Sequence, residues 1–168
     1  KAVSVPSGTK ILEAAKQVGV KIPSLCQMKI DEIGFTNECA SCRVCMVSAG
    51  RKLVPACGTM VKEGMVVNTN TPEALKYRKN VVELLLSDHP QDCYTCAKSG
   101  KCELQDLAAD MGIRKIRFKG EQSTSPIDTS SYSIVKDNDK CILCRRCETM
   151  CGDIQTCGIL TGIDRGFN

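Results

Sequence analysis

The only histidine of the sequence opens a short run of cysteines whose spacing is suited to binding metal. The run has the pattern His-x3-Cys-x2-Cys-x5-Cys and consists of His89, Cys93, Cys96 and Cys102. Thiolate sulfur suits zinc and iron-sulfur clusters, and an imidazole nitrogen can replace a thiolate on iron and raise the reduction potential. An isolated histidine is usually a hydrogen-bonded surface or core residue, but one that opens a metal-spaced cysteine run is better interpreted as a ligand. We therefore expect these four side chains to bind one cluster.

A second run, near the end of the sequence, has the pattern Cys-x2-Cys-x2-Cys-x3-Cys and consists of Cys141, Cys144, Cys147 and Cys151. This is the spacing of bacterial ferredoxins, in which the first three cysteines bind one 4Fe-4S cluster and the fourth binds a second cluster. A zinc knuckle or a redox disulfide does not need four cysteines at these intervals. We therefore expect a 4Fe-4S cluster on the first three.

This run departs from the ferredoxin pattern in two respects. Gly152 follows the last cysteine where ferredoxins have proline, and the sequence contains no second four-cysteine run. Cys157 is a fourth ligand, an unligated thiol, or the remnant of a site that residues beyond Asn168 complete. We favour a truncated sequence, with Cys151 as a ligand of a second 4Fe-4S cluster completed outside this segment.

Regular elements are expected around a third group of cysteines, in the first part of the chain. Alternation over residues 2–5 predicts a strand whose partner would precede the first residue, so the start also looks trimmed. Thr9 predicts the cap of a helix that ends at Gly19, with its apolar face on Ile11, Leu12, Ala15 and Val18. Short apolar stretches predict three further strands, at residues 44–47, 53–55 and 64–67.

This order of elements around a cysteine loop resembles plant-type ferredoxins. They have a β-grasp fold and a 2Fe-2S cluster held by one early cysteine, a Cys-x2-Cys pair and one distal cysteine. Residues 41–47 and 52–57 are similar to the family's Cys-Arg-x-Cys-x-Val and Leu-x-Pro-Ala-Cys segments. The resemblance implies four ligands, Cys26, Cys42, Cys45 and Cys57. Because the gap after the early cysteine is extended, the choice between Cys39 and Cys45 stays open, and zinc held by two cysteine pairs is the alternative.

Two helices are expected to frame the histidine site. A capping hydroxyl at Thr71 followed by Pro72 predicts a helix that leads to His89, and a shorter helix is expected over residues 103–112. Residues 119–132 are polar and are interpreted as a linker. The apolar positions of the first helix recur at helical spacing and predict a core-facing stripe of Ala74, Leu75, Val82, Leu85 and Leu86.

Composition excludes several other classes. The 168 residues include 13 cysteines, but their spacing, their odd number and the lack of a signal peptide in the sequence favour a reducing cytoplasm over a secreted disulfide scaffold. The net charge of +4 comes from scattered residues and indicates no nucleic-acid partner. No apolar stretch approaches the length of a membrane span. With one histidine and no phosphate-binding loop, we expect no catalytic residues.

The order of the three sites resembles the front of three related families over essentially the whole chain. These are the catalytic subunit of FeFe hydrogenases, the large peripheral-arm subunit of complex I, and the small diaphorase subunit of NAD-reducing nickel-iron hydrogenases. The finer resemblance is to multimeric, NAD(P)-linked, often electron-bifurcating FeFe hydrogenases. It is carried by residues 89–93, 102–105, 141–151 and 164–168.

The resemblance implies an α+β chain that relays electrons within an oxidoreductase. It implies a β-grasp 2Fe-2S domain at residues 1–70, a small helical 4Fe-4S domain at 71–118 held by the histidine site, a linker at 119–132, and a partial ferredoxin-like 4Fe-4S domain at 133–168. It places an H-cluster, FMN and NAD(P) in parts or subunits outside this sequence. The implied partners are a flavin- and NAD(P)-binding subunit, a small ferredoxin-like subunit and soluble ferredoxin.

Other functions remain open from the sequence. An equivalent relay in a complex I-like NADH dehydrogenase, an NAD-reducing nickel-iron hydrogenase or a formate dehydrogenase uses the same sites. A zinc-stabilised interaction module would be colourless and contain zinc, whereas clusters give a brown protein. A redox sensor with reversible Cys-x2-Cys disulfides would be revealed by counting thiols without oxygen.

Overall fold

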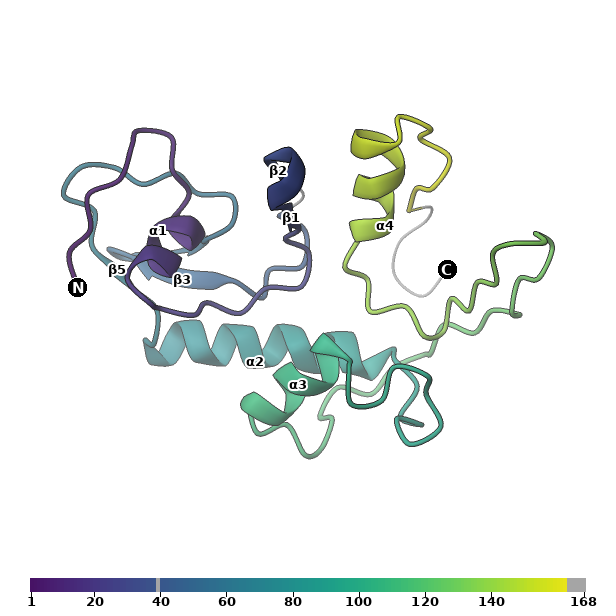
Figure 1. The fold of residues 1–168 in the computed structure, drawn as a ribbon. Helices are drawn as coiled ribbons and strands as arrows, with labels where there is room; N and C mark the ends of the chain where they lie inside the picture. Colours follow the sequence, from purple (N-terminus) through teal and green to yellow (C-terminus); the bar gives the residue numbers. More distant parts are fainter. Residues whose placement is uncertain (39, 163–168) are drawn as a thin grey trace. The chain divides into compact units, whose positions relative to one another are not determined.

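The computed structural model describes residues 1–38 and 40–162 of the chain. Helices and short strands are mixed within them, as the sequence predicts (Figure 1). The chain divides into two compact units. The first joins residues 1–81 to 144–161, and the second contains residues 82–143 and Gly162. The domain boundaries proposed from the sequence remain a prediction.

The first unit contains a three-stranded antiparallel sheet in the order β4-β3-β5. Its strands are β3 (Met46–Ala49), β4 (Lys52–Pro55) and β5 (Val67–Asn68). Ala49 pairs with Lys52, so a two-residue turn joins β3 to β4. Gly50 in this turn has a φ of 60°, a conformation that side chains disfavour. The strands predicted at residues 44–47 and 53–55 are thus confirmed, with shifted bounds for the first.

Two predicted strands are displaced or absent. Residues 64–66 form no strand, because a turn in which the Met65 N–H donates to the Lys62 carbonyl at 3.0 Å occupies this stretch and pairing begins only at Val67. Residues 2–5 form no strand either. Their alternation alone is insufficient, because a strand needs a neighbour to accept its hydrogen bonds. In the described part, the nearest pairing is an isolated bridge between Lys10 and Met60.

Helix α1 (Ile11–Gln17) begins one residue later than its predicted cap implies. Lys10 takes the capping position, while the Thr9 hydroxyl donates to the Pro6 carbonyl at 2.7 Å. The chain leaves the helix through Gly19, with a φ of 69°, as predicted. Ile11 and Leu12 are buried on the face that meets the rest of the first unit.

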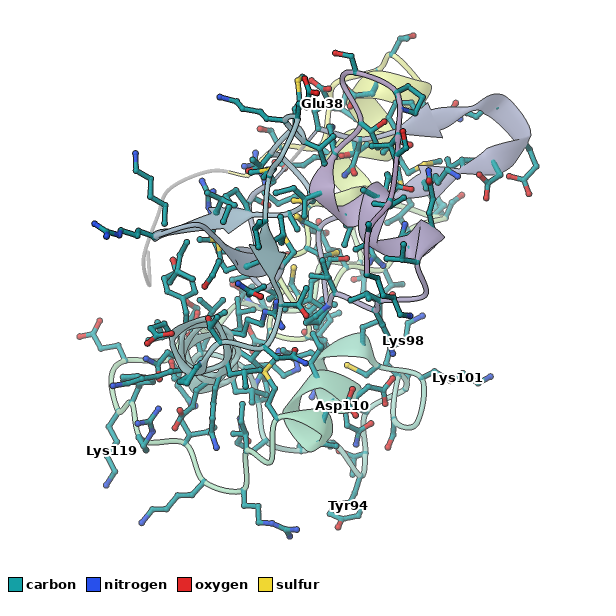
Figure 2. All side chains as sticks on the ribbon, turned by 90° about the vertical axis from the view of Figure 1, so that its left-hand side faces the viewer. Glu38, Tyr94, Lys98, Lys101, Asp110 and Lys119 are labelled. Carbon is teal, nitrogen blue, oxygen red and sulfur yellow. The ribbon has the colours of Figure 1, made fainter. Side chains whose placement is uncertain are left out.

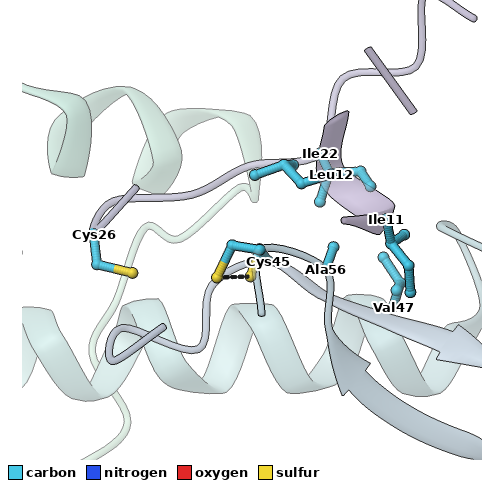
Figure 3. Packing of buried hydrophobic residues seen from close by; sticks show 8 residues of the cluster. Ile11, Leu12, Ile22, Cys26, Cys45, Val47 and Ala56 are labelled. Carbon is cyan, nitrogen blue, oxygen red and sulfur yellow. Dashed lines mark hydrogen bonds between the residues drawn. The ribbon is translucent and has the colours of Figure 1, made fainter. Parts of the chain in front are cut away.

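The core of the first unit is small and includes cysteines. Its buried members are Ile11, Leu12, Ile22, Cys26, Cys45, Val47, Ala56 and Cys57. Figure 3 shows the side chains of Ile11, Val47 and Ala56 gathered together, and the sulfur of Cys26 directed toward Cys45. The aliphatic core therefore runs directly into the group of sulfur atoms.

Helix α2 (Pro72–Ser87) starts where the sequence predicts. The Thr71 hydroxyl accepts a hydrogen bond from the Ala74 N–H at 3.2 Å, and so caps the first turn. Ala74 and Val82 are fully buried, but Leu75 is 49% exposed, so the predicted stripe is wrong there. The buried face also includes Arg78 and Glu83, which a pattern of apolar residues cannot predict because both are charged.

The second unit contains the end of α2 and helix α3 (Glu103–Asp110), which the sequence predicts. Leu104 and Leu107 are its buried residues. Glu83 of α2 is 1% exposed and fixes the segment after α3. Its carboxylate accepts from the Arg117 backbone N–H at 2.8 Å and from the Arg117 Nε at 2.9 Å. The predicted linker at residues 119–132 contains no helix or strand.

Two short pieces were not predicted. A hairpin of β1 (Lys29–Ile30), the single turn η1 (Asp31–Ile33) and β2 (Phe35–Thr36) fills the extended gap after Cys26. In the first unit, α4 (Arg146–Thr149) continues into the wider turn η2 (Met150–Ile154). Every helix in the described residues is too short or too polar to cross a lipid bilayer.

Candidate iron-sulfur sites

Four of the five cysteines in the first part of the chain lie together, and all four are free thiols. Backbone pairing continues past β3 and β4, with the Ala56 N–H donating to the Cys45 carbonyl at 3.1 Å. It places the Cys45 and Cys57 sulfurs 3.3 Å apart, as the dashed line in Figure 3 marks. The Cys26 N–H approaches the Cys42 sulfur at 3.5 Å. Cys39 lies outside the described residues.

These four thiols share their protons through hydrogen bonds. Bonds from Cys42 and Cys57 lower the pKa of the Cys26 thiol, and a bond from Cys57 lowers the pKa of Cys45 to about 7 although burial opposes it. The same sulfur contacts raise the pKa values of Cys42 and Cys57, and burial raises them further. The lowered pKa values of Cys26 and Cys45 favour the thiolate, which is the form that binds metal. Four neighbouring sulfurs, three of them on buried residues, fit a soft metal group.

Asn37 positions this site and was missed by the sequence reasoning. It is only 5% exposed, and its Nδ2 donates to the Cys26 carbonyl at 2.7 Å. Its Oδ1 accepts from the Met28 N–H at 2.8 Å, and its own N–H donates to the Met28 carbonyl at 3.1 Å. The side chain thus closes the β1-β2 hairpin against the backbone of Cys26. The sequence held no signal for this role, since asparagine between cysteines is usually a turn residue.

The second site lies in the second unit, between the end of α2 and the start of α3. His89, Cys93, Cys96 and Cys102 line one small pocket together with Pro90, Asp92, Ser99 and Gln105. Successive turns fold the cysteine loop back on itself. In one of them, the Ser99 N–H donates to the Cys96 carbonyl at 3.0 Å. The Gln105 side chain accepts from the Gly100 N–H at 3.0 Å and holds the loop to α3. Figure 2 shows Tyr94 and Lys101 directed outward from this loop.

His89 has a ring nitrogen that makes no hydrogen bond within the described part of the chain and is available to bind a metal. Its Nδ1 is buried and has no hydrogen-bond partner among the described residues. Burial lowers the pKa of His89, outweighing the opposing effects of the Cys141 backbone and of the Asp92 and Asp88 carboxylates. The ring is therefore neutral at pH 7, which is the protonation state that binds iron. An unpaired buried nitrogen beside three free thiols fits a cluster in this pocket.

The third group is divided between the two units. Cys141 is exposed and belongs to the second unit, whereas Cys144, Cys147 and Cys151 belong to the first. Cys147 lies on α4, and Cys151 is buried on η2, where its sulfur accepts from the Leu160 N–H at 3.4 Å. The convergence of these four sulfurs remains a prediction. Cys157 is exposed, and its thiol donates to the Gln155 carbonyl.

Strained backbone accompanies the cysteine loops. Arg43, between Cys42 and Cys45, has a φ of 58°, and Leu143 and Arg145, on either side of Cys144, have φ values of 55° and 59°. Side chains rarely adopt this conformation, and it persists only where the surroundings hold it.

In the part of the chain that the structure covers, no three His, Cys, Asp or Glu side chains are arranged around a single metal ion.

Comparison with known families identifies the class. Residues 1–72 match the 2Fe-2S iron-sulfur cluster binding domain, and residues 78–117 match the NADH-ubiquinone oxidoreductase-G iron-sulfur binding region. The first match contains the four associated thiols, and the second contains the histidine pocket. The chain is therefore an iron-sulfur protein with 2Fe-2S and 4Fe-4S clusters as its cofactors.

Individual relatives narrow this class. The chain is 51% identical to subunit HndD of the NADP-reducing hydrogenase of Solidesulfovibrio fructosivorans, covering 99% of this chain and 29% of that protein. It is 35% identical to the G 2 subunit of the NADH-quinone oxidoreductase of Rhizobium meliloti, and the match covers 99% of this chain and 19% of that protein. It also matches the gamma subunit of the NAD-reducing hydrogenase HoxS of Cupriavidus necator at 32% identity, and the match covers 88% of this chain and 61% of that protein.

A solved structure agrees with these relatives. A chain of an NAD⁺-reducing [NiFe]-hydrogenase in the H₂-reduced state superposes with a TM-score of 0.84 at 28% identity, covering 98% of this chain and 68% of that one. The chain is thus an iron-sulfur region of the kind shared by NAD(P)-linked hydrogenases and the G subunit of NADH-quinone oxidoreductases. It spans less than a third of the first two relatives named above.

Replacing Asn37 by alanine is expected to destabilise the first unit. The substitution leaves the Cys26 carbonyl and the Met28 N–H without their partners, at a cost of roughly 1–3 kcal/mol for each buried group. The measurement is denaturant unfolding followed by the visible absorption of the cluster. Asn68→Ala, at an exposed position of β5, is the matched control. Equal midpoints for both variants would show that Asn37 has no positioning role.

Proposed function

We propose that this chain relays single electrons through one 2Fe-2S and several 4Fe-4S clusters inside an NAD(P)-linked oxidoreductase. The observation that carries the proposal is the gathering of Cys26, Cys42, Cys45 and Cys57 in the segment that matches the 2Fe-2S domain. The clusters supply one-electron exchange when bound. The protein's residues supply thiolates, exclude water by burial and fix the spacing of the ligands.

The ligand sets are assigned from the cysteine spacing, and the two sites described in the first and second units support the first two sets. The 2Fe-2S cluster is assigned to Cys26, Cys42, Cys45 and Cys57, and a 4Fe-4S cluster to His89, Cys93, Cys96 and Cys102. A further 4Fe-4S cluster is assigned to Cys141, Cys144 and Cys147, with Cys151 as a ligand of a second such cluster. Helix α2 lies between the two sets in the sequence and ends two residues before His89.

The host enzyme that we favour is a multimeric, NAD(P)-linked FeFe hydrogenase of the electron-bifurcating type, located in the cytoplasm. The identity to a subunit of an NADP-reducing hydrogenase supports an NAD(P)-linked hydrogenase. Its H-cluster would lie outside this chain, and its partners would be a flavin- and NAD(P)-binding subunit, a small ferredoxin-like subunit and soluble ferredoxin. The alternative is a complex I-type NADH dehydrogenase. The 35% identity to a subunit of the NADH-quinone oxidoreductase of Rhizobium meliloti supports this alternative.

Anaerobic purification tests the relay itself. The full-length protein should be brown, contain iron and acid-labile sulfide, and give on reduction a slowly relaxing 2Fe-2S electron paramagnetic resonance (EPR) signal together with fast-relaxing 4Fe-4S signals. These signals should respond to NADPH or NADH when the partner subunits are present. A colourless protein that contains zinc and no labile sulfide would contradict the proposal.

Replacing His89 by cysteine is expected to keep a cluster and lower its midpoint potential. A thiolate adds negative charge that the neutral imidazole lacks, so reduction becomes less favourable, by on the order of 100 mV. An EPR-monitored redox titration of the 4Fe-4S signals measures the shift. Tyr94→Phe, at a fully exposed position of the same loop, is the control and should leave every potential unchanged. An unshifted titration of the His89→Cys protein would remove His89 from the ligand set.

Serine substitutions distinguish Cys39 from Cys45 as the 2Fe-2S ligand. Cys45→Ser should abolish or strongly alter the 2Fe-2S signal, because Cys45 is buried with its sulfur 3.3 Å from that of Cys57. Cys39→Ser should leave the signal as it is. The reverse result, a signal lost only with Cys39→Ser, would transfer the ligand role to Cys39.

A further inference from the structure

Arg78 is a buried cation on the face of α2 that packs in the first unit. Its side chain is 4% exposed. Its Nε donates to the Met46 carbonyl at 2.7 Å, and Met46 directly follows Cys45. Its second terminal nitrogen, Nη2, is buried and has no partner. Among the residues that the structure covers, no carboxylate forms an ion pair with Arg78.

A buried guanidinium needs a negative charge nearby. Arginine keeps its proton in proteins, so it cannot relieve the cost of burial by becoming neutral. A buried cation without a counter-charge is strongly destabilising. Burial does lower the pKa of Arg78, and the one effect that opposes it is the negative charge of Cys45. The carbonyl that Arg78 binds belongs to the residue directly after Cys45, so the counter-charge that the structure offers lies on the cysteine sulfurs.

We propose that Arg78 compensates the charge of the 2Fe-2S site and sets its reduction potential, with Nη2 as the hydrogen-bond donor left for it. The inference rests on the proposed ligand set that includes Cys45. A cluster held by four thiolates carries a net negative charge that grows by one on reduction. A fixed positive charge beside it stabilises the reduced form more than the oxidised form, and so raises the midpoint potential.

A purely structural role does not account for the observed bonds. Fastening α2 to the Met46 carbonyl requires one donor, which a neutral side chain can supply without the cost of a buried charge. The unpartnered Nη2 adds to that cost unless something accepts from it. Arg78 also lies outside the segment that matches the 2Fe-2S domain and inside the one that matches the second iron-sulfur region. The segment that holds one cluster would thereby adjust the potential of the other.

The test is an EPR-monitored redox titration of the full-length, anaerobically purified protein, at a temperature at which the 2Fe-2S signal is observed alone. Arg78→Gln removes the charge and should shift the 2Fe-2S midpoint to lower potential. Arg78→Lys retains the charge and should recover most of the wild-type value. Lys76→Gln removes the same charge from an exposed position of α2, where water screens it, and should shift nothing.

Each outcome decides the matter. An Arg78→Gln protein with a loaded cluster and the wild-type potential, or an equal drop in Arg78→Gln and Arg78→Lys, would overturn the proposal. Should Arg78→Gln fail to load, wild-type protein labelled with guanidino-¹⁵N-arginine replaces it. Pulsed EPR should then show a nitrogen coupling to the reduced cluster that Arg78→Lys loses, and no coupling would overturn the proposal. Absence of any 2Fe-2S signal from the wild type would instead refute the ligand assignment, and the inference with it.

Discussion

The first unit depends on burying sulfur atoms that have no covalent partner. Cys26, Cys45 and Cys57 occupy core positions that aliphatic side chains fill in other small domains. Thiols contribute apolar packing, but thiolates in the same place cost free energy unless a positive group neutralises them. A cluster supplies iron to these sulfurs, so its binding and the folding of this core are one equilibrium. We expect the short strands and single-turn elements around the site to depend on bound metal for part of their stability.

Helix α2 connects this core to the histidine pocket, and its charges are placed accordingly. It is fixed at its start by the Thr71 hydroxyl, and it buries Ala74 in its first turn and Val82 further along. Glu83 then holds the segment that contains Arg117. Polar contacts with defined geometry thus fix the register of a helix whose apolar face is narrow. His89 follows two residues after the end of this helix.

The sequence predicted what depends on local pattern. Cysteine spacing predicted the two groups that the structure gathers, and the signals at Thr71 and Gly19 located helix ends, because caps and ligand loops are short-range features. It did not predict Asn37, Arg78 or the buried Glu83, because the burial of a polar side chain depends on partners distant in the chain. The expected strand at residues 2–5 failed for the same reason, since strand formation needs a neighbour. The left-handed backbone at Arg43 was not predicted either, because arginine has no local preference for this conformation.

Two opposite charges are buried five residues apart on α2, and they are compensated in different ways. Glu83 has its partner in the polypeptide, since the side chain and the backbone N–H of Arg117 both donate to it. Arg78 donates from its Nε to one carbonyl, that of Met46, and its Nη2 has no acceptor among the residues that the structure describes. The pairing of Glu83 is therefore independent of any cofactor, whereas the pairing of Arg78 is complete only when negative charge is held at the cysteines. It follows that cluster loading stabilises the first half of α2 more than the second, although both halves belong to one continuous helix.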